Sequence, residues 1–219
     1  MSRIIVTIKI FFIRMFSRRN LPESINCLKR YKNLYQSLYF AQQFSDPVMT
    51  LKYALNQASP SGIALEFGVY SGKTLSTIAQ KFPGQTFGFD SFDGLPEYWR
   101  DGFPEGKFKV DIKPFIQGAE IIEGLFQDSL EPFLQGLTSK ISFIHLDADL
   151  YSSTKYVLTE LNYLIEPNCI ILFDEFMNYP GFESHEFLAF SEWCDEGSRI
   201  CNPITFTDCH EQMGFVVVQ

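Results

Sequence analysis

Apolar residues follow two different rhythms along the chain. Up to about residue 59 they are spaced three or four positions apart, first over residues 25–44 and then over 45–58, where Ser-Asp-Pro begins the second run. This spacing predicts two helices. From residue 60 onward, short continuous apolar runs alternate with helical stretches. We therefore divide the chain into an N-terminal arm with helices, residues 1–59, and a second domain, residues 60–219.

The short apolar runs of the second domain predict seven strands. They cover residues 62–69, 85–90, 119–124, 141–149, 169–175, 203–207 and 214–218. Helices are expected between them, over residues 72–82, 128–137, 152–165 and around 183–194. Continuous apolar strands separated by helices indicate a parallel sheet covered on both faces. The expected fold is therefore α/β, a doubly wound and mainly parallel sheet of seven strands, closed by an antiparallel hairpin.

One segment interrupts this alternation. Residues 98–117 are rich in Gly, Pro and charged residues and have no clear period. Long loops inside compact domains are usually functional, and this one follows the second expected strand, at the ligand-binding edge of the sheet. We expect a lid or a substrate-recognition loop here, with a plain insertion as the alternative.

Composition and charge narrow the range of functions. Hydrophobic residues make up 46% and charged residues 20% of the chain, as in globular proteins. Residues 1–32 hold eight Lys or Arg against one acid, whereas the remainder holds ten against twenty-five acids. Nucleic-acid binding depends mainly on basic side chains that neutralise phosphates, so we expect none here. An acidic body suits a protein that recruits a cation.

The basic arm and the cysteines bear on location. Residues 1–19 are apolar and basic, but their uncharged runs fall far short of the roughly 20 residues that span a bilayer. No small-residue cleavage site follows. The arm is expected to lie on an anionic membrane surface or to pack on its own domain or a partner subunit, as in a homodimer. The five scattered cysteines indicate reduced thiols, and hence the cytoplasm.

A glycine loop follows the first strand of the second domain. The stretch from Glu66 to Thr74, EFGVYSGKT, ends like the phosphate loop of an NTPase or kinase. That loop needs four residues between its first glycine and the Gly-Lys, but only three separate Gly68 from Gly72. Glu66 is also poorly suited to a triphosphate. An acid beside closely spaced glycines suits a cofactor with an ammonium group and no phosphate, such as S-adenosylmethionine.

The next strand supports this interpretation. It ends in Asp90, some twenty residues beyond the glycine loop. A carboxylate in this position can accept hydrogen bonds from both hydroxyls of a ribose, as in dinucleotide-binding folds. A solvated aspartate at the end of a strand is the alternative. The two features together favour a nucleoside-containing cofactor over a nucleoside triphosphate.

Four acids end two later strands. Asp147 and Asp149 alternate onto the same face, and Asp174 and Glu175 follow the next strand. Carboxylates that gather at one sheet edge repel each other unless a cation is present. Oxygen ligands without a nearby Cys favour Mg²⁺, or another hard divalent cation, over zinc. In the alternative, Glu175 is a surface residue and Asp147 merely orders a loop.

Five segments together resemble the macrocin O-methyltransferase family: EFGVYSGKT, GFDSFDGLPE, GLFQDSL, HLDADLYSST and ILFDEF, spread over residues 62–180. Members of this family are class I, S-adenosylmethionine-dependent enzymes with a Rossmann-like fold, and many methylate sugar hydroxyls with the help of Mg²⁺. The resemblance implies contacts to the methionine end, the ribose and the adenine of the cofactor. In that order, these residues are Glu66, Gly68, Tyr70, Ser71, Gly72 and Thr74; Asp90 and Ser91; and Gln127, Asp128 and Ser129.

The resemblance also assigns the acids. It implies that Asp147, Asp174 and Glu175 bind the metal and that Asp149 is the general base. The family commonly has two aspartates where this chain has Asp174 and Glu175. His145 is expected to pack in the core. Asn178, Tyr179 and His185 are candidate contacts to the acceptor, and the alternative is that His185 is an exposed helix residue.

The leading hypothesis is a metal-assisted O-methyltransferase for a hydroxyl of a sugar, a glycoside or another hydroxylated small molecule. Three alternatives remain. The chain is a P-loop NTPase or kinase, a methyltransferase fold kept as a non-catalytic partner, or an enzyme that methylates a polysaccharide or lipid-linked glycan at a membrane.

Overall fold

The computed structural model describes residue 34 and residues 37–207 and 212–219. In these parts of the chain, eight strands form one sheet in the order β1-β7-β8-β6-β5-β2-β3-β4. Their bounds are β1 Gln42–Phe44, β2 Ile63–Phe67, β3 Thr86–Asp90, β4 Ala119–Glu123, β5 Ile141–Leu146, β6 Ile170–Phe173, β7 Cys201–Thr207 and β8 Met213–Val217. The sheet is mainly parallel, and β8 runs antiparallel to both β6 and β7. The predicted α/β fold and its closing hairpin are confirmed.

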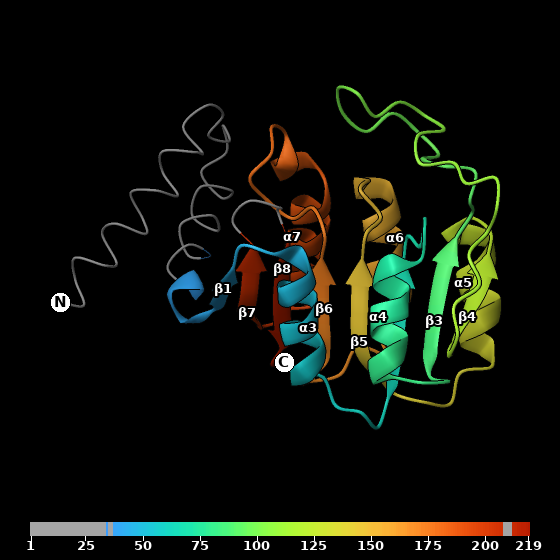
Figure 1. Cartoon of the computed structure of the whole chain (residues 1–219). Coiled ribbons are helices and arrows are strands. Elements are labelled where there is room, and N and C mark those ends of the chain that lie inside the picture. The colour runs from blue at the N-terminus through green and yellow to red at the C-terminus, as the bar shows by residue number, and fades with distance from the viewer. Residues whose placement is uncertain (1–33, 35–36, 208–211) are drawn as a thin grey trace.

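Helices cover both faces of this sheet (Figure 1). In Figure 1, α3 and α4 lie on one face, and α5, α6 and α7 lie on the other. The bounds are α3 Pro47–Gln57, α4 Lys73–Lys81, α5 Phe126–Gln135, α6 Tyr151–Glu160 and α7 Glu186–Glu196, with short 3-10 turns η1 Leu38–Phe40 and η2 Phe182–Ser184. Each helix of the second domain begins within three residues of its predicted start. Asp46 caps the predicted second N-terminal helix by accepting a hydrogen bond from the Val48 N–H.

The strand count differs from the prediction because residues 42–44, expected within a helix, form β1. This short strand pairs parallel to β7, with Gln42 opposite Thr205. Its sequence, Gln-Gln-Phe, has no strand pattern of its own. It becomes a strand because β7 presents a free edge for pairing, so tertiary context overrides local preference. The remainder of the predicted helix over 25–44 lies largely outside the described residues, as do residues 1–19.

The order of the strands fixes where a ligand can bind. From β2 the chain proceeds outward to β3 and β4, and it then returns to place β5 and β6 on the other side of β2. This reversal between β2 and β5 opens a crevice at the carboxyl ends of the strands, which is where doubly wound folds bind their ligands. The glycine loop follows β2, Asp147 and Asp149 follow β5, and Asp174 and Glu175 follow β6, the next strand beyond β5.

Aromatic side chains fill the interior beneath this edge. Phe67 and Phe89, on neighbouring strands, stack with ring centroids 4.9 Å apart, and Phe126 of α5 meets Phe67 edge-on. Both strand residues are fully buried. Such packing fixes the ends of β2 and β3 relative to α5, and it thereby places the segments that carry the predicted cofactor residues.

The segment of residues 98–117 rises above the carboxyl ends of the strands (Figure 1). It forms no helix, and its only strand-like pairing is a bridge between Arg100 and Phe103. It also packs on the glycine loop, because a Cβ at Gly72 would lie 2.5 Å from the Ile116 side chain. Among the described residues, no helix combines the length and the apolar character needed to cross a membrane.

Candidate active site

A cavity lies at the carboxyl edge of the sheet, at the reversal between β2 and β5. Its wall comes from the glycine loop, from the segments after β3, β4, β5 and β6, and from the start of α6. The lining residues are Gly68, Tyr70, Asp90, Ser91, Gly94, Leu95, Pro96, Phe108, Gly124, Leu125, Phe126, Gln127, Asp147, Ala148, Asp149, Ser153, Asp174 and Glu175. The cavity therefore brings the predicted ribose residues together with all four predicted acids.

Gly68 joins the two sides of this cavity. Its φ is +96°, and a Cβ there would lie only 2.0 Å from the backbone oxygen of Asp147. The turn after β2 thus passes directly against the turn after β5, and only a residue without a side chain allows this approach. Three non-glycine residues of the cavity wall, Tyr70, Phe108 and Asp149, also have positive φ angles, of 47°, 69° and 60°. Strained backbone of this kind gathers at functional sites.

Asp90 organises the glycine loop from the neighbouring strand. Its Oδ2 accepts hydrogen bonds from the Val69 and Tyr70 N–H groups at 2.8 and 2.7 Å, and its Oδ1 accepts one from the Phe92 N–H at 2.7 Å. These loop N–H groups are the donors that a phosphate would need. An internal carboxylate already occupies them, so the loop is arranged against a phosphate ligand. A carboxylate has lone pairs to spare for further donors such as ribose hydroxyls.

The other predicted cofactor residues divide into two groups. Gly68, Tyr70, Asp90, Ser91 and Gln127 line the cavity. The remaining ones do not line it, namely Glu66, Ser71, Gly72, Thr74, Asp128 and Ser129. Ser129, for example, donates its hydroxyl to the Leu125 backbone oxygen at 2.8 Å and supports the first turn of α5.

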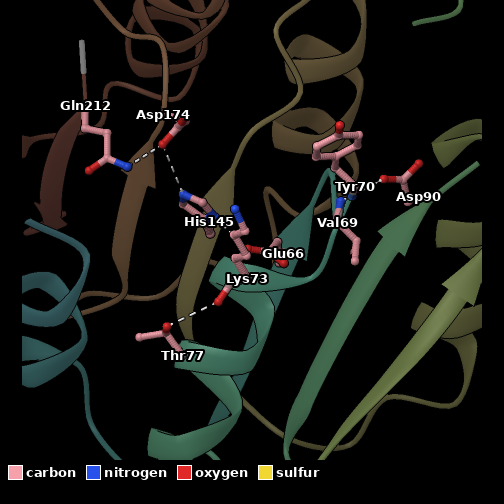
Figure 2. A network of polar contacts seen from close by, with 9 residues as sticks. All are labelled: Glu66, Val69, Tyr70, Lys73, Thr77, Asp90, His145, Asp174 and Gln212. Atoms are coloured by element: carbon pink, nitrogen blue, oxygen red, sulfur yellow. Dashed lines mark hydrogen bonds and ion pairs between the residues drawn. The ribbon is translucent and has the colours of Figure 1, made fainter. Parts of the chain in front are cut away.

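Glu66 instead lies beneath the cavity, in a buried polar network (Figure 2). Its Oε1 lies 2.8 Å from Nδ1 of His145, and both side chains are fully buried. The other ring nitrogen of His145, Nε2, lies 3.9 Å from Oδ1 of Asp174. Gln212, at the start of the β8 segment, also donates its side-chain amide to this Oδ1. Asp174 therefore points toward His145 and Gln212, as Figure 2 shows.

Glu66 and His145 each shift the pKa of the other. Burial raises the pKa of Glu66, although the hydrogen bond and charge of His145 offset part of this effect. Burial alone lowers the pKa of His145, but the hydrogen bond and charge of Glu66 and the charges of Asp174 and Glu175 raise it above its ordinary value. These directions compete for one proton. The carboxylates around the ring all act to raise the pKa of His145.

The remaining acids form a cluster. Asp147, Asp149 and Glu175 each place a carboxylate oxygen within 4.8 Å of the others. Burial raises the pKa of Asp147 well above its ordinary value, and the charges of Asp174 and Glu175 raise it further. The pKa of Asp149 is raised by burial and by the charge and hydrogen bond of Glu175. The geometry thus groups Asp149, rather than Asp174, with Asp147 and Glu175.

Two residues beside this cluster escaped prediction. Arg100, from the segment over residues 98–117, lies 3.5 Å from Glu175, and its guanidinium stacks 3.9 Å from the Trp99 ring. Glu186, in the first turn of α7, is fully buried, and burial and the charges of Glu175 and Asp174 raise its pKa well above its ordinary value. Neither residue stands in a recognisable pattern, because each reaches the acids only through tertiary packing.

The three predicted acceptor residues lie outside the cavity wall. Tyr179 is buried, and the Arg100 guanidinium lies 4.3 Å from its ring centre. The His185 ring stacks on Tyr179, and burial and Arg100 lower the pKa of His185. Asn178 is exposed and has a φ of 72°. Tyr179 and His185 both contact Trp99, so these two residues lie where residues 98–117 dock.

Comparison with known families identifies the class of this protein. Residues 65–176, more than half of the chain, match a family model described as "Methyltransferase domain". The chain therefore belongs to this family and is a methyltransferase. This membership decides against the interpretation of the glycine loop as part of an NTPase or kinase. A search of curated proteins gives no significant match.

Solved structures share the fold. CalS11, a calicheamicin methyltransferase, is 18% identical with a TM-score of 0.61, over 91% of this chain and 95% of that one. The O-methyltransferase NovP is 18% identical with a TM-score of 0.53, over 88% and 81%. An O-methyltransferase from Bacillus cereus, solved with SAH, is 13% identical with a TM-score of 0.52, over 94% and 96%. At these identities the likeness establishes the Rossmann-like methyltransferase fold.

Proposed function

We propose that this protein is an S-adenosylmethionine-dependent O-methyltransferase that acts on a hydroxyl of a sugar, a glycoside or another hydroxylated small molecule. The observation that carries the proposal is the single cavity in which Asp90 and the glycine loop face a cluster of carboxylates. Structural relatives support it, since CalS11 is described as a TDP-rhamnose 3'-O-methyltransferase and the O-methyltransferase TomG was solved with SAM. Within this class, the macrocin-type enzymes remain the proposed subgroup.

The cofactor would lie along the side of the cavity formed by β2, β3 and β4. Asp90 would accept hydrogen bonds from the ribose hydroxyls, and Ser91 would donate one to the ribose. Gln127 would contact the adenine. The backbone around Gly68 and Tyr70 would approach the methionine end, where the absence of a side chain at Gly68 leaves room. Glu66 would act from below, by supporting the glycine loop rather than by touching the cavity.

The acids fit a hard divalent cation such as Mg²⁺. Carboxylate oxygens within one small cluster are the donor set that such a cation prefers. The pKa values of Asp147 and Asp149 are raised by burial and by the neighbouring charges, which a cation would offset. Asp147 and Glu175 would hold it, with Oδ2 of Asp174 as the third ligand, because Oδ1 already faces His145 and Gln212. When bound, the cation would act as a Lewis acid toward an acceptor hydroxyl.

Asp149 would then serve as the general base. It would take the proton of the acceptor hydroxyl while the oxygen forms a bond to the methyl carbon and the carbon–sulfur bond breaks. The products would be the methyl ether and S-adenosylhomocysteine, with the proton on Asp149. Positioning and charge neutralisation would supply most of the acceleration.

One observation favours a second set of carboxylates around the cation. Asp149, not Asp174, groups with Asp147 and Glu175 in the cluster. In this arrangement Asp149 would be the third ligand. Asp149→Asn separates the two, because loss of a base lowers kcat at unchanged cation affinity, whereas loss of a ligand lowers cation affinity as well.

Calorimetric titration tests the proposal. S-adenosylmethionine, S-adenosylhomocysteine and ATP would each be titrated into the protein, with and without Mg²⁺. We expect binding of the first two and none of ATP. A panel of sugars and glycosides, incubated with S-adenosylmethionine and Mg²⁺, would then be searched by mass spectrometry for addition of one methyl group. Absence of S-adenosylmethionine binding would overturn the proposal outright.

A further inference from the structure

The fully buried His145 contacts both sides of the cavity at once. Its Nδ1 faces Glu66 of β2 at 2.8 Å, and its Nε2 faces Asp174, just after β6, at 3.9 Å (Figure 2). The two carboxylates belong to strands on either side of β5, which carries the ring. A packed core histidine would need only one partner. This ring instead lies between two acids, one on each side of the strand-order reversal.

The Glu66 end of this contact continues into the glycine loop. Glu66 ends only two residues before Gly68, and a hydrogen bond from Thr74 lowers its pKa. Thr74 lies in the first turn of α4, directly after the loop. The second carboxylate oxygen, Oε2, has no partner in full hydrogen-bond geometry among the described residues, so Thr74 is near but not ideally aligned. The ring is thus connected to both ends of the loop.

The Asp174 end lies beside the acid cluster, because the charge of Asp174 acts on both Asp147 and Asp149. His145 and the Gln212 amide both approach Oδ1 of Asp174, one from β5 and one from the β8 segment. The Gln212 amide is hydrogen-bonded to this oxygen, whereas Nε2 of His145 faces it at ion-pair distance, beyond the length of a hydrogen bond. Both contacts draw the same oxygen toward β5 and β8 and leave Oδ2 for the cation. Groups that orient a carboxylate in this way tune its ability to bind a cation.

We propose that His145 is a positioning residue that couples the cofactor-binding glycine loop to the carboxylate cluster, by holding Glu66 through Nδ1 and Asp174 through Nε2. A shift of either carboxylate moves the ring and therefore changes the position of the other. Occupation of one side of the cavity then favours occupation of the other. Such coupling is reciprocal by thermodynamic necessity. The inference rests on the proposed function, since it requires both a cofactor and a cation.

Two substitutions of His145 each preserve one of its two contacts, either the one to Glu66 or the one to Asp174. In His145→Asn the amide nitrogen replaces Nδ1, so the donor to Glu66 remains and the group facing Asp174 is lost. In His145→Gln the longer side chain places its amide near the position of Nε2, so the group facing Asp174 remains and the donor to Glu66 is lost. A merely structural histidine would not distinguish these variants, because both remove the ring.

The experiment measures S-adenosylhomocysteine and Mg²⁺ affinities by calorimetry, each with and without the other. In the unmodified protein we expect each ligand to strengthen the other by a factor of about 5–150. His145→Asn should weaken Mg²⁺ binding about 10–100-fold and leave S-adenosylhomocysteine binding nearly unchanged. His145→Gln should show the reverse. Both should bring the coupling factor close to one.

Two further variants remove contacts at the two ends of the network and leave His145 in place. They keep the proposal testable if the His145 variants fail to fold. Thr74→Val should reduce the coupling factor and leave Mg²⁺ affinity unchanged. Gln212→Met should weaken Mg²⁺ binding but preserve the coupling, because His145 still joins the two carboxylates. Melting temperatures establish that each variant is folded.

The possible outcomes distinguish failure of the proposed function from failure of the proposed role of His145. If the unmodified protein binds neither ligand, the proposed function fails. If it binds both, but the two His145 variants lose both affinities equally, or if Thr74→Val leaves the coupling factor intact, the positioning role of His145 is overturned.

Discussion

The two sides of the cavity stabilise their carboxylates in opposite ways. On the cofactor side, Asp90 satisfies its charge internally, with three backbone N–H groups as donors. On the acid side, Asp147, Asp149 and Glu175 face one another, and their repulsion and burial raise the pKa values of both aspartates. The Asp90 carboxylate is thus stabilised by the protein's own hydrogen bonds. The carboxylates of the acid side are stabilised by bound protons.

This difference teaches what each side is built to accept. A carboxylate that already holds the loop N–H groups shapes a pocket for a ligand rich in hydroxyl and ammonium groups. Carboxylates with raised pKa values release protons when a cation binds, so cation binding depends on pH. The same residue type at the ends of neighbouring strands therefore serves recognition on one side and charge compensation on the other.

Substitution of Asp149 should have the largest effect. Asp149→Asn keeps the shape of the side chain but removes the proton acceptor. We expect kcat to fall about 10²–10⁴-fold, the usual contribution of a general base. The measurement is steady-state methyl transfer to an accepted sugar, with Mg²⁺ and S-adenosylmethionine saturating.

The matched control is Asp93→Asn, which changes an exposed aspartate after β3 that forms an ion pair with Lys109. It should leave kcat unchanged. If Asp149→Asn retains full activity, the acid side does not perform proton transfer, and the contrast between the two sides loses its catalytic meaning.

Gly68 joins the two sides, and its substitution should damage both. In Gly68→Ala, the new Cβ would meet the Asp147 backbone oxygen at 2.0 Å, in a backbone conformation with φ of +96°. The strained backbone alone costs about 1–3 kcal/mol. We therefore expect a clearly lower melting temperature, together with weakened binding of both S-adenosylhomocysteine and Mg²⁺.

Gly84→Ala provides the comparison for this change. Gly84 also has a positive φ, of 73°, but a Cβ there meets no atom within 4 Å. The Gly84→Ala variant therefore measures the cost of the backbone conformation alone, without the overlap with Asp147. Equal melting temperatures for the two variants would mean that the close approach of the two turns contributes nothing.

Sequence patterns predicted the sheet and its cavity because both depend on local signals. Continuous apolar runs identified the strands of the second domain, and the acids and glycines that follow them were placed at one edge by the topology of a parallel sheet. β1 escaped prediction because Gln42–Phe44 becomes a strand only through pairing with β7. No local pattern marks such an edge strand.

The orientation of side chains was harder to predict than their location. Asp174 and Glu175 are adjacent in sequence, yet Asp174 points to His145 and Gln212, and Glu175 meets Asp149. Arg100 and Gln212 approach these acids from segments far away along the chain. Contacts of this kind depend on three-dimensional packing, so a single sequence carries no sign of them.

On the cofactor side, Asp90→Asn should have an intermediate effect. The amide group keeps one acceptor oxygen but turns an N–H₂ toward backbone donors, so the contacts to the Val69 and Tyr70 N–H groups or to the Phe92 N–H are lost. Hydrogen bonds to a charged group contribute about 1.5–3 kcal/mol. We expect S-adenosylhomocysteine affinity to fall about 10–150-fold, with Mg²⁺ affinity unchanged. Calorimetry measures both, and an equal loss of the two affinities would contradict the division of the cavity.

The pH dependence of stability should show the smallest effect. Asp147 and Asp149 have pKa values raised well above 3.8 in the folded protein. Above a pH of about 4 the unfolded chain releases these protons while the folded protein keeps them. Their contribution to stability is therefore complete below that pH and is lost as the pH rises through the folded pKa values. In EDTA, the melting temperature should decrease across this range.

Two conditions assign that decrease to the acid side. Mg²⁺ should reduce the slope, because it replaces the protons as the compensating charge. Asp149→Asn should also reduce it, by removal of one titrating group. Each kcal/mol corresponds to about 2–4 °C for a chain of this size, so differential scanning fluorimetry resolves the effect. A slope that neither Mg²⁺ nor Asp149→Asn reduces would assign the titration to carboxylates outside the acid side and remove the contrast.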